Sequence, residues 1–292
     1  MGGAFVAVAN DSSAVWWNPA GLAEGPFLDA GFARTTTGAG SVPRHHASGF
    51  ALGTPPLGIS YYRLRITRIE PADPIAHERA GREDRRAGTV GSLSVSQLGA
   101  TVLQTLIPGI HAGATLKYLR GRAIVAPDRP AATAGDLPGA GDELETGTES
   151  EFDLDVGVLA VAGAFRVGVT GRNLREADFG NVALPRQVRV GAAFDAAALG
   201  RTPLTVALDA DVRTYATSTG DRRVIALGAE RWFGARQIGV RAGGRLNTVG
   251  ARARAVTVGG SWSPRPGVYL DGHAAGGDAV ERGWGLAARI SF

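Results

Sequence analysis

Apolar and polar residues alternate with a period of two along most of this chain. From residue 152 to 158, Phe, Leu, Val and Val take the even positions, whereas Asp153, Asp155 and Gly157 take the odd positions. Successive side chains of a β-strand point to opposite faces, so the pattern predicts strands with one apolar and one polar face. About fourteen such segments can be counted. They lie near 27–36, 46–54, 57–69, 89–106, 111–125, 149–160, 164–172, 187–195, 203–214, 222–233, 238–246, 253–263, 268–274 and 283–292.

Short and long connections alternate between these segments. The tight turns at 54–56 and 107–109 alternate with longer polar connections, among them 70–88, 126–148 and 173–186. A transmembrane barrel needs an even number of strands, with short turns on one rim and longer loops on the other. We therefore predict an all-β protein, a transmembrane antiparallel up-and-down β-barrel of about fourteen strands. A soluble two-layer sandwich is the alternative, because its polar rows would face water.

Composition excludes several other classes of protein. Glycine accounts for 43 of the 292 residues, and interior glycine weakens helices. The 31 basic and 27 acidic residues are too balanced for a nucleic-acid-binding protein, and no cysteine is present for disulfides or thiolate metal sites. We find no hydrolase, nucleotide-binding or zinc-protease motif. The pair His45–His46 lacks further metal ligands. We expect no enzymatic activity, no cofactor and no bound metal.

The polar rows of the predicted strands carry charges of both signs. If the apolar rows face lipid, these charges point into the lumen, where they can pair. On the lipid face, an arginine or lysine would cost about 2–4 kcal/mol at mid-membrane. The predicted lumen charges are Arg63, Arg65, Asp153, Asp155, Arg189, Asp209, Asp211 and Arg241.

The third segment departs from strict alternation. Its apolar row runs through Ile59 and Tyr61 and then shifts by one residue to Tyr62 and Leu64. A change of phase within one strand predicts a bulge or kink. The alternatives are a bulge without functional consequence, or amphiphilic residues that lie above the membrane.

Three stretches resemble the FadL/TodX-type outer-membrane superfamily. Asn18, Pro19, Ala20, Gly21 and Leu22 match in full the Asn-Pro-Ala-Gly-Leu element of its N-terminal hatch. The stretch formed by 167–174 and 184–194 is similar to its recurring strand–loop–strand block. The last nine residues resemble the signal that the barrel-assembly machinery reads, with Ile290 and Phe292 at the fitting positions. The resemblance implies a hatch at 1–25 and a barrel at 26–292.

The resemblance also implies a function and a location. Members are fourteen-stranded barrels of the outer membrane in Gram-negative-type bacteria, and they take up fatty acids and other hydrophobic molecules. The ligand passes the hatch and leaves toward the lipid through a lateral opening at a kinked third strand. The implied ligand contacts in this chain are Phe5, Trp16, Trp17, Tyr61 and Tyr62.

Shorter members, similar to the PorV group, imply an alternative function. They serve a secretion or surface protein complex and transport nothing themselves. The expected partners are therefore outer-membrane lipid, the barrel-assembly machinery, and either a hydrophobic small molecule or such a complex. Residues 1–3 carry neither the basic region nor the cleavage site of a signal peptide, so we expect an export signal to precede Met1 in the precursor.

Overall fold

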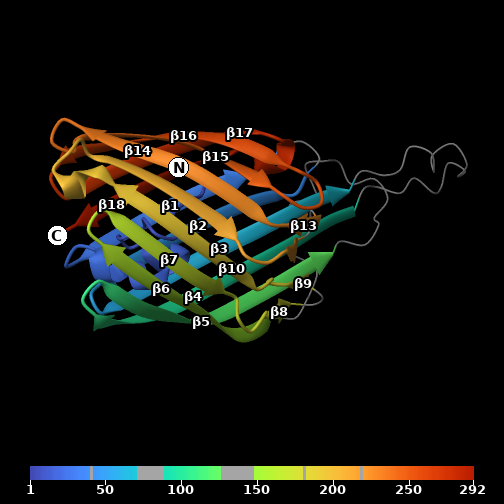
Figure 1. Cartoon of the computed structure of the whole chain (residues 1–292). Coiled ribbons are helices and arrows are strands. Elements are labelled where there is room, and N and C mark those ends of the chain that lie inside the picture. The colour runs from blue at the N-terminus through green and yellow to red at the C-terminus, as the bar shows by residue number, and fades with distance from the viewer. Residues whose placement is uncertain (40–41, 71–88, 126–147, 180–181, 218–219) are drawn as a thin grey trace, which may run out of the picture.

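The computed structural model describes residues 1–39, 42–70, 89–125, 148–179, 182–217 and 220–292. Fourteen strands form a closed antiparallel barrel, which confirms the predicted fold class (Figure 1). Each strand pairs with the barrel strands that precede and follow it, and β1 closes the ring on β18. The barrel strands are β1 (Asp29–Thr37), β2 (Arg44–Thr54), β3 (Leu57–Glu70), β4 (Thr89–Ile107), β5 (Ile110–Val125), β6 (Glu149–Ala162), β7 (Phe165–Arg172), β10 (Gln187–Asp195), β11 (Leu204–Asp211), β14 (Val224–Phe233), β15 (Ile238–Asn247), β16 (Arg254–Arg265), β17 (Val268–Gly277) and β18 (Gly283–Ser291).

The connections are sorted between the two ends of the barrel. The tight turns gather at the end where the chain finishes, on the left of Figure 1. The opposite end carries the hairpin of β8 (Asp178–Phe179) with β9 (Val182–Ala183), and that of β12 (Tyr215–Thr217) with β13 (Gly220–Arg222). Two connections contain a short 3-10 helix: η2 (Ala196–Leu199) follows β10, and η3 (Ala279–Glu281) follows β17. Each predicted segment corresponds to one barrel strand.

The two faces of the wall differ as the alternation predicts. On β6, Phe152 is 52% exposed and Val158 is 45% exposed, whereas Asp153 and Asp155 between them are buried in the lumen. Large apolar side chains on the outer face are exposed on the other strands as well. A soluble sandwich would bury its apolar rows, whereas a lipid-facing barrel displays them. The sandwich alternative is therefore excluded.

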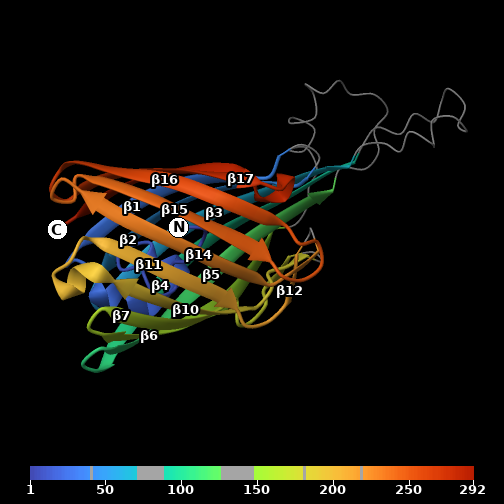
Figure 2. The same ribbon diagram turned by 45° about the horizontal axis from the view of Figure 1, so that its top comes forward.

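The N-terminal segment lies inside the ring of strands, in the half of the barrel nearer the tight turns (Figures 1 and 2). It contains the helical turn α1 (Ala14–Trp17) and the 3-10 helix η1 (Pro19–Glu24). Asn18 between them is extended, at φ −159° and ψ 107°, because a residue before proline disfavours the helical region. No helix in the described part of the chain is long and apolar enough to cross a membrane.

The third strand corrects two predictions. β3 pairs without a register shift along β2 from Leu57 to Thr67, and along β4 over its whole length. The predicted kink is therefore absent, and the wall is closed at this place. Because the strand keeps its phase, Arg63 and Arg65 follow Tyr61 on the outer face and are exposed, so their assignment to the lumen was wrong.

The physical reason for the apparent phase change is that the lumen is not polar along β3. Tyr62 turns inward and packs on Trp16 of the hatch, with 4.7 Å between ring centroids. Ile66 turns inward onto an apolar cluster formed by strands β4 and β5 and the connection after β7. Apolar residues thus occupy the inner row where apolar material fills the barrel.

Candidate functional site

Asn18 joins the hatch to the barrel wall. Its side chain is fully buried, and its Nδ2 donates to the carbonyl oxygens of Val6 and Val158, each at 3.0 Å. Its Oδ1 accepts from the backbone N–H of Ala20 at 3.2 Å, which caps η1. A Cβ on Gly157 of β6 would lie 2.0 Å from this Oδ1, so the approach requires glycine in the wall. One amide therefore fixes two hatch segments and one strand.

The rest of the Asn-Pro-Ala-Gly-Leu element packs equally closely. Pro19 and Ala20 lie against Gly113 of β5, where an added Cβ would be 2.6 Å from the Pro19 carbonyl carbon. Gly21 faces the Ala9 carbonyl oxygen, and a Cβ there would approach it to 2.1 Å. Leu22 is buried in the apolar cluster that includes Val15 and Ala14. The motif is thus a packing element whose one polar side chain, that of Asn18, is hydrogen-bonded through both its nitrogen and its oxygen.

Asp209 on β11 holds the beginning of the hatch. Its buried carboxylate accepts from the backbone N–H groups of Phe5 at 2.8 Å and Val6 at 3.0 Å. On β16, three strands further round the ring, Thr257 Oγ1 accepts a hydrogen bond from the N–H of Gly2 at 2.8 Å. The two bonds to the Asp209 carboxylate are charge-assisted, and such bonds are among the stronger hydrogen bonds in proteins.

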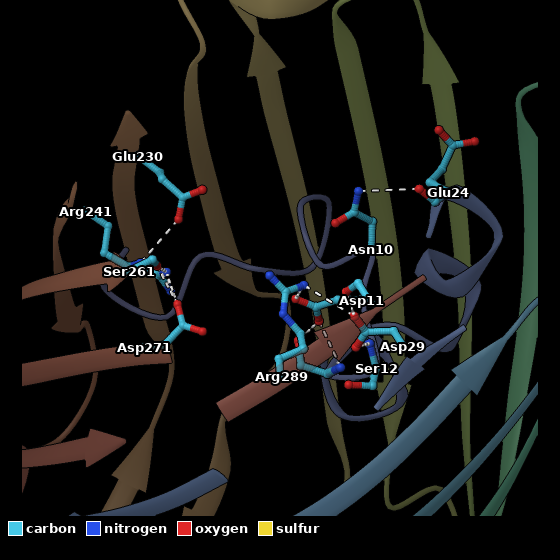
Figure 3. Close-up of polar contacts among 12 residues, drawn as sticks. Asn10, Asp11, Ser12, Glu24, Asp29, Glu230, Arg241, Ser261, Asp271 and Arg289 are labelled. Carbon is cyan, nitrogen blue, oxygen red and sulfur yellow. Dashed lines mark hydrogen bonds and ion pairs between the residues drawn. The ribbon is translucent and has the colours of Figure 1, made fainter. Parts of the chain in front are cut away.

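A further set of contacts ties the middle of the hatch to β1 and β18 (Figure 3). Arg289 forms an ion pair with Asp11 at 2.5 Å, and the N–H of Ser12 donates to Asp29 at 2.8 Å. The Arg289 guanidinium also lies 4.5 Å from the ring centroid of Tyr269. Attachment on β6, β11, β16 and β18 holds the hatch from several sides of the barrel.

The predicted ligand contacts divide between the two faces of the wall. Phe5 and Trp17 pair at 4.9 Å between ring centroids, and Trp16 pairs with Tyr62, all four inside the barrel. Tyr61 lies on the outer face and is 48% exposed. Beside Trp17 is a cavity of only about 10 Å³, lined by Val6, Trp17, Thr170, Arg172, Gln187 and Arg189. That volume is close to the minimum for one water molecule, so this cavity is too small for a hydrocarbon.

The six remaining predicted lumen charges lie inside the barrel and are paired or hydrogen-bonded. Lys117 on β5 lies 2.6 Å from Asp155 and 3.4 Å from Asp153, and all three are buried. Arg189 pairs with Asp211 at 2.7 Å, and Arg241 pairs with Asp271 at 2.6 Å. Asp209 binds the hatch as described above. Among the described residues, no group of three or more His, Asp or Glu side chains is placed to hold a metal ion.

A second obstruction was missed at the sequence level. The connection after β7 folds into the lumen, where Phe179 of β8 is 1% exposed among Leu93, Val95 and Leu119. The sequence predicts only a polar connection at 173–186. The available signal was the apolar character of inward positions on β4 and β5, which a water-filled lumen would not need. Phe179 also lies where Gly121 leaves room, since a Cβ there would be 2.2 Å from its ring.

The residues of the predicted assembly signal lie on the outside of the barrel. Ile290 on β18 and the terminal Phe292 are 46% and 76% exposed, at the end that carries the tight turns. Their recognition by the barrel-assembly machinery remains a prediction.

Comparison with known proteins identifies the class to which this hatch-containing barrel is similar. The Ralstonia pickettii toluene transporter TbuX matches 100% of this chain over 96% of its own, with a TM-score of 0.67 and 12% identity. The Pseudomonas putida toluene transporter TodX matches 99% over 96%, with a TM-score of 0.60 and 11% identity. A Pseudomonas aeruginosa FadL homologue matches 99% over 96%, with a TM-score of 0.60 and 10% identity. The chain therefore has the fold of the FadL/TodX-type channels along its whole length, which confirms the resemblance at the level of the fold.

The sequence comparisons add one family. The family described as "F plasmid transfer operon, TraF, protein" matches residues 83–211, from the connection before β4 to the end of β11. No curated protein matches the sequence significantly.

Proposed function

We propose that the protein is an outer-membrane channel for small hydrophobic molecules, held closed by its hatch. The observation that carries the proposal is the aromatic surface formed by Phe5, Trp16, Trp17 and Tyr62 inside the barrel. Aromatic rings offer a large apolar contact area to a hydrocarbon. Two similar folds carry the description of toluene transporters, which supports the same class of substrate here.

The closed wall changes the proposed route. Because β3 is paired on both sides, the ligand would travel along the barrel axis, first past the Phe179 cluster and then past Trp16 and Trp17. Passage requires the hatch to move, since the cavity beside Trp17 is far smaller than a hydrocarbon. The bonds made by Asn18 and Asp209 would then be the closing contacts.

Location in the outer membrane of a Gram-negative-type bacterium is part of the same proposal. Two observations support it. The exposed apolar side chains of the outer face would be buried against lipid in a membrane, and the fold is shared with hydrocarbon channels. Fractionation of expressing cells tests it. The protein should need detergent for extraction and should migrate differently in electrophoresis with and without boiling, whereas extraction in plain buffer would contradict it.

Adjacent tyrosines provide a matched test of transport. Uptake of toluene and of a long-chain fatty acid would be measured in cells that carry the wild type, Tyr62→Ala, Trp16→Ala or Tyr61→Ala. Since an aromatic pair contributes about 0.5–1.5 kcal/mol, the two inward variants should change uptake by about two- to tenfold. Tyr61→Ala removes the same ring from the outer face and should leave uptake unchanged. Wild-type uptake no greater than in cells without the protein would refute a channel.

The second candidate is an interaction protein that serves a secretion or surface complex without transport of its own. The observations that favour it are the match to the TraF-described family and the double obstruction of the lumen by the hatch and the β8–β9 connection. The long connections 70–88 and 126–148, which would dock the partner, lie almost entirely outside the described residues. A pull-down from detergent-solubilised membranes that recovers a stable large complex, together with absent uptake, would favour this function.

A further inference from the structure

The outer wall carries a basic patch formed by β3 and β5. Arg63 and Arg65 on β3 and Arg120 and Arg122 on β5 lie outside the barrel, on either side of serines of β4. A hollow of about 250 Å³ opens between them. Its lining is Arg63, Arg65, Ser92, Ser94, Ser96, Arg120, Gly121, Arg122 and Thr148. The patch belongs to none of the contacts that hold the hatch.

The strand register arranges these side chains in rows. An apolar row crosses neighbouring strands through directly paired residues, and in pairing order it reads Phe32, Phe50, Tyr61, Leu98, Tyr118 and Phe152. Two positions further toward the long-loop end, the paired residues are Arg34, Ser48, Arg63, Ser96, Arg120 and Ser150. The change from apolar side chains to alternating arginine and serine therefore occurs in register across these six strands.

The distance between Arg63 and Arg120 in this row allows both side chains to bind one anionic group. Ser96 pairs with Arg63 on one side and with Arg120 on the other. Neighbouring strands are about 4.8 Å apart, so the two arginines flank the serine at about 10 Å from each other. The short serine side chain leaves the hollow between them, and its hydroxyl is a further donor. Guanidinium groups bind phosphate by paired hydrogen bonds, which makes phosphate the fitting ligand chemistry.

Charge complementarity favours an anion from outside the chain. Within the described ranges, no carboxylate forms an ion pair with Arg63, Arg65 or Arg120. On β6, Glu151 takes the position next to the outward-facing Phe152, so its side chain points to the other face of the strand. Arg63, Arg65 and Arg120 thus form a positive surface directly beside apolar rings that contact lipid in the proposed orientation.

We propose that this patch binds the phosphorylated headgroup of a membrane lipid in the leaflet next to the long-loop end. The acyl chains would lie along Tyr61, Leu98 and Tyr118, while the phosphate would sit over Ser96 between Arg63 and Arg120. The inference rests on the proposed insertion in the outer membrane, but it does not depend on transport through the lumen.

Native mass spectrometry of the detergent-folded full chain tests the inference. The probes are bis-phosphorylated lipid A, the same glycolipid without phosphates, and inorganic phosphate. The variant Arg63→Ser/Arg120→Ser removes both flanking guanidiniums. The control Arg213→Ser/Arg252→Ser makes the same charge change at exposed arginines near the same end, in connections beside β11 and β16. Electrophoresis without boiling shows that each variant is folded.

The wild type and the control should retain lipid A, and the patch variant should bind it at least about tenfold more weakly, since hydrogen bonds to charged groups are being removed. Equal retention by the folded patch variant, or equal retention of the dephosphorylated glycolipid, would overturn the inference. Binding of inorganic phosphate as strong as that of lipid A would assign the site to a free anion and overturn it too. The fractionation experiment tests membrane insertion separately, and the uptake assay tests transport separately, so failure of either is distinguishable from failure of lipid binding at this patch.

Discussion

Replacement of Asn18 by aspartate removes two hydrogen bonds from the junction between hatch and wall with almost no change in side-chain size. Aspartate keeps the oxygen that accepts from Ala20, but it presents a second oxygen to the carbonyls of Val6 and Val158. Each lost hydrogen bond to a buried carbonyl, which then faces an oxygen in place of a donor, costs about 1–3 kcal/mol, so hatch docking should weaken by about 2–6 kcal/mol. No water can compensate readily, because the side chain is 0% exposed.

Limited proteolysis of the detergent-folded protein measures this loss. Cleavage within the hatch, identified by mass spectrometry, reports the fraction of molecules whose hatch has left its site, and 2 kcal/mol alone would increase that fraction by about 30-fold. The emission of Trp16 and Trp17 should shift to longer wavelength as the hatch becomes hydrated. The barrel should still migrate as a folded species without boiling, because the strand pairing is unchanged.

Asn10→Asp is the matched control. It makes the same chemical change within the same segment, but Asn10 Nδ2 contacts only the Glu24 carbonyl oxygen, at 3.4 Å (Figure 3). We expect proteolysis of this variant close to that of the wild type. If Asn18→Asp and Asn10→Asp are cleaved at the same rate, the conclusion that Asn18 fastens the hatch is incorrect.

Three other changes test the packing of the lumen. Gly157→Ala should mimic Asn18→Asp in the proteolysis assay, because the new Cβ would lie 2.0 Å from Asn18 Oδ1, whereas Gly276→Ala meets no atom within 4 Å and should be silent. Lys117→Met strands two buried carboxylates and should lower the free energy of unfolding in urea by about 3–5 kcal/mol, part of which Asp155→Asn in the same chain should restore. Phe179→Ala should weaken the docking of the connection after β7 by about 3–5 kcal/mol and so expose that connection to proteolysis. The hatch should stay protected, and simultaneous cleavage of the hatch would show that the two obstructions are coupled.

Much of the fold could be predicted because lipid and lumen impose opposite demands on alternate residues. The strand count and the inward position of Asp153 and Asp155 follow from that rule. The Asn-Pro-Ala-Gly-Leu element was recognisable because its residues pack against glycines of the wall, which leaves little freedom for substitution. The rule failed at Arg63 and Arg65, where it assumed that arginine must avoid the outer face.

The sequence by itself determined that this chain forms a barrel with an apolar exterior and a hatch at its beginning, because period-two alternation and the hatch element are local patterns. Only the tertiary structure decided what the lumen contains and where the apolar exterior ends. Tyr62 and Ile66 face inward because the hatch and the β8–β9 connection fill the barrel there. Those contacts join residues far apart in the chain. No periodicity encodes them, and they leave the arginines of β3 on the outside.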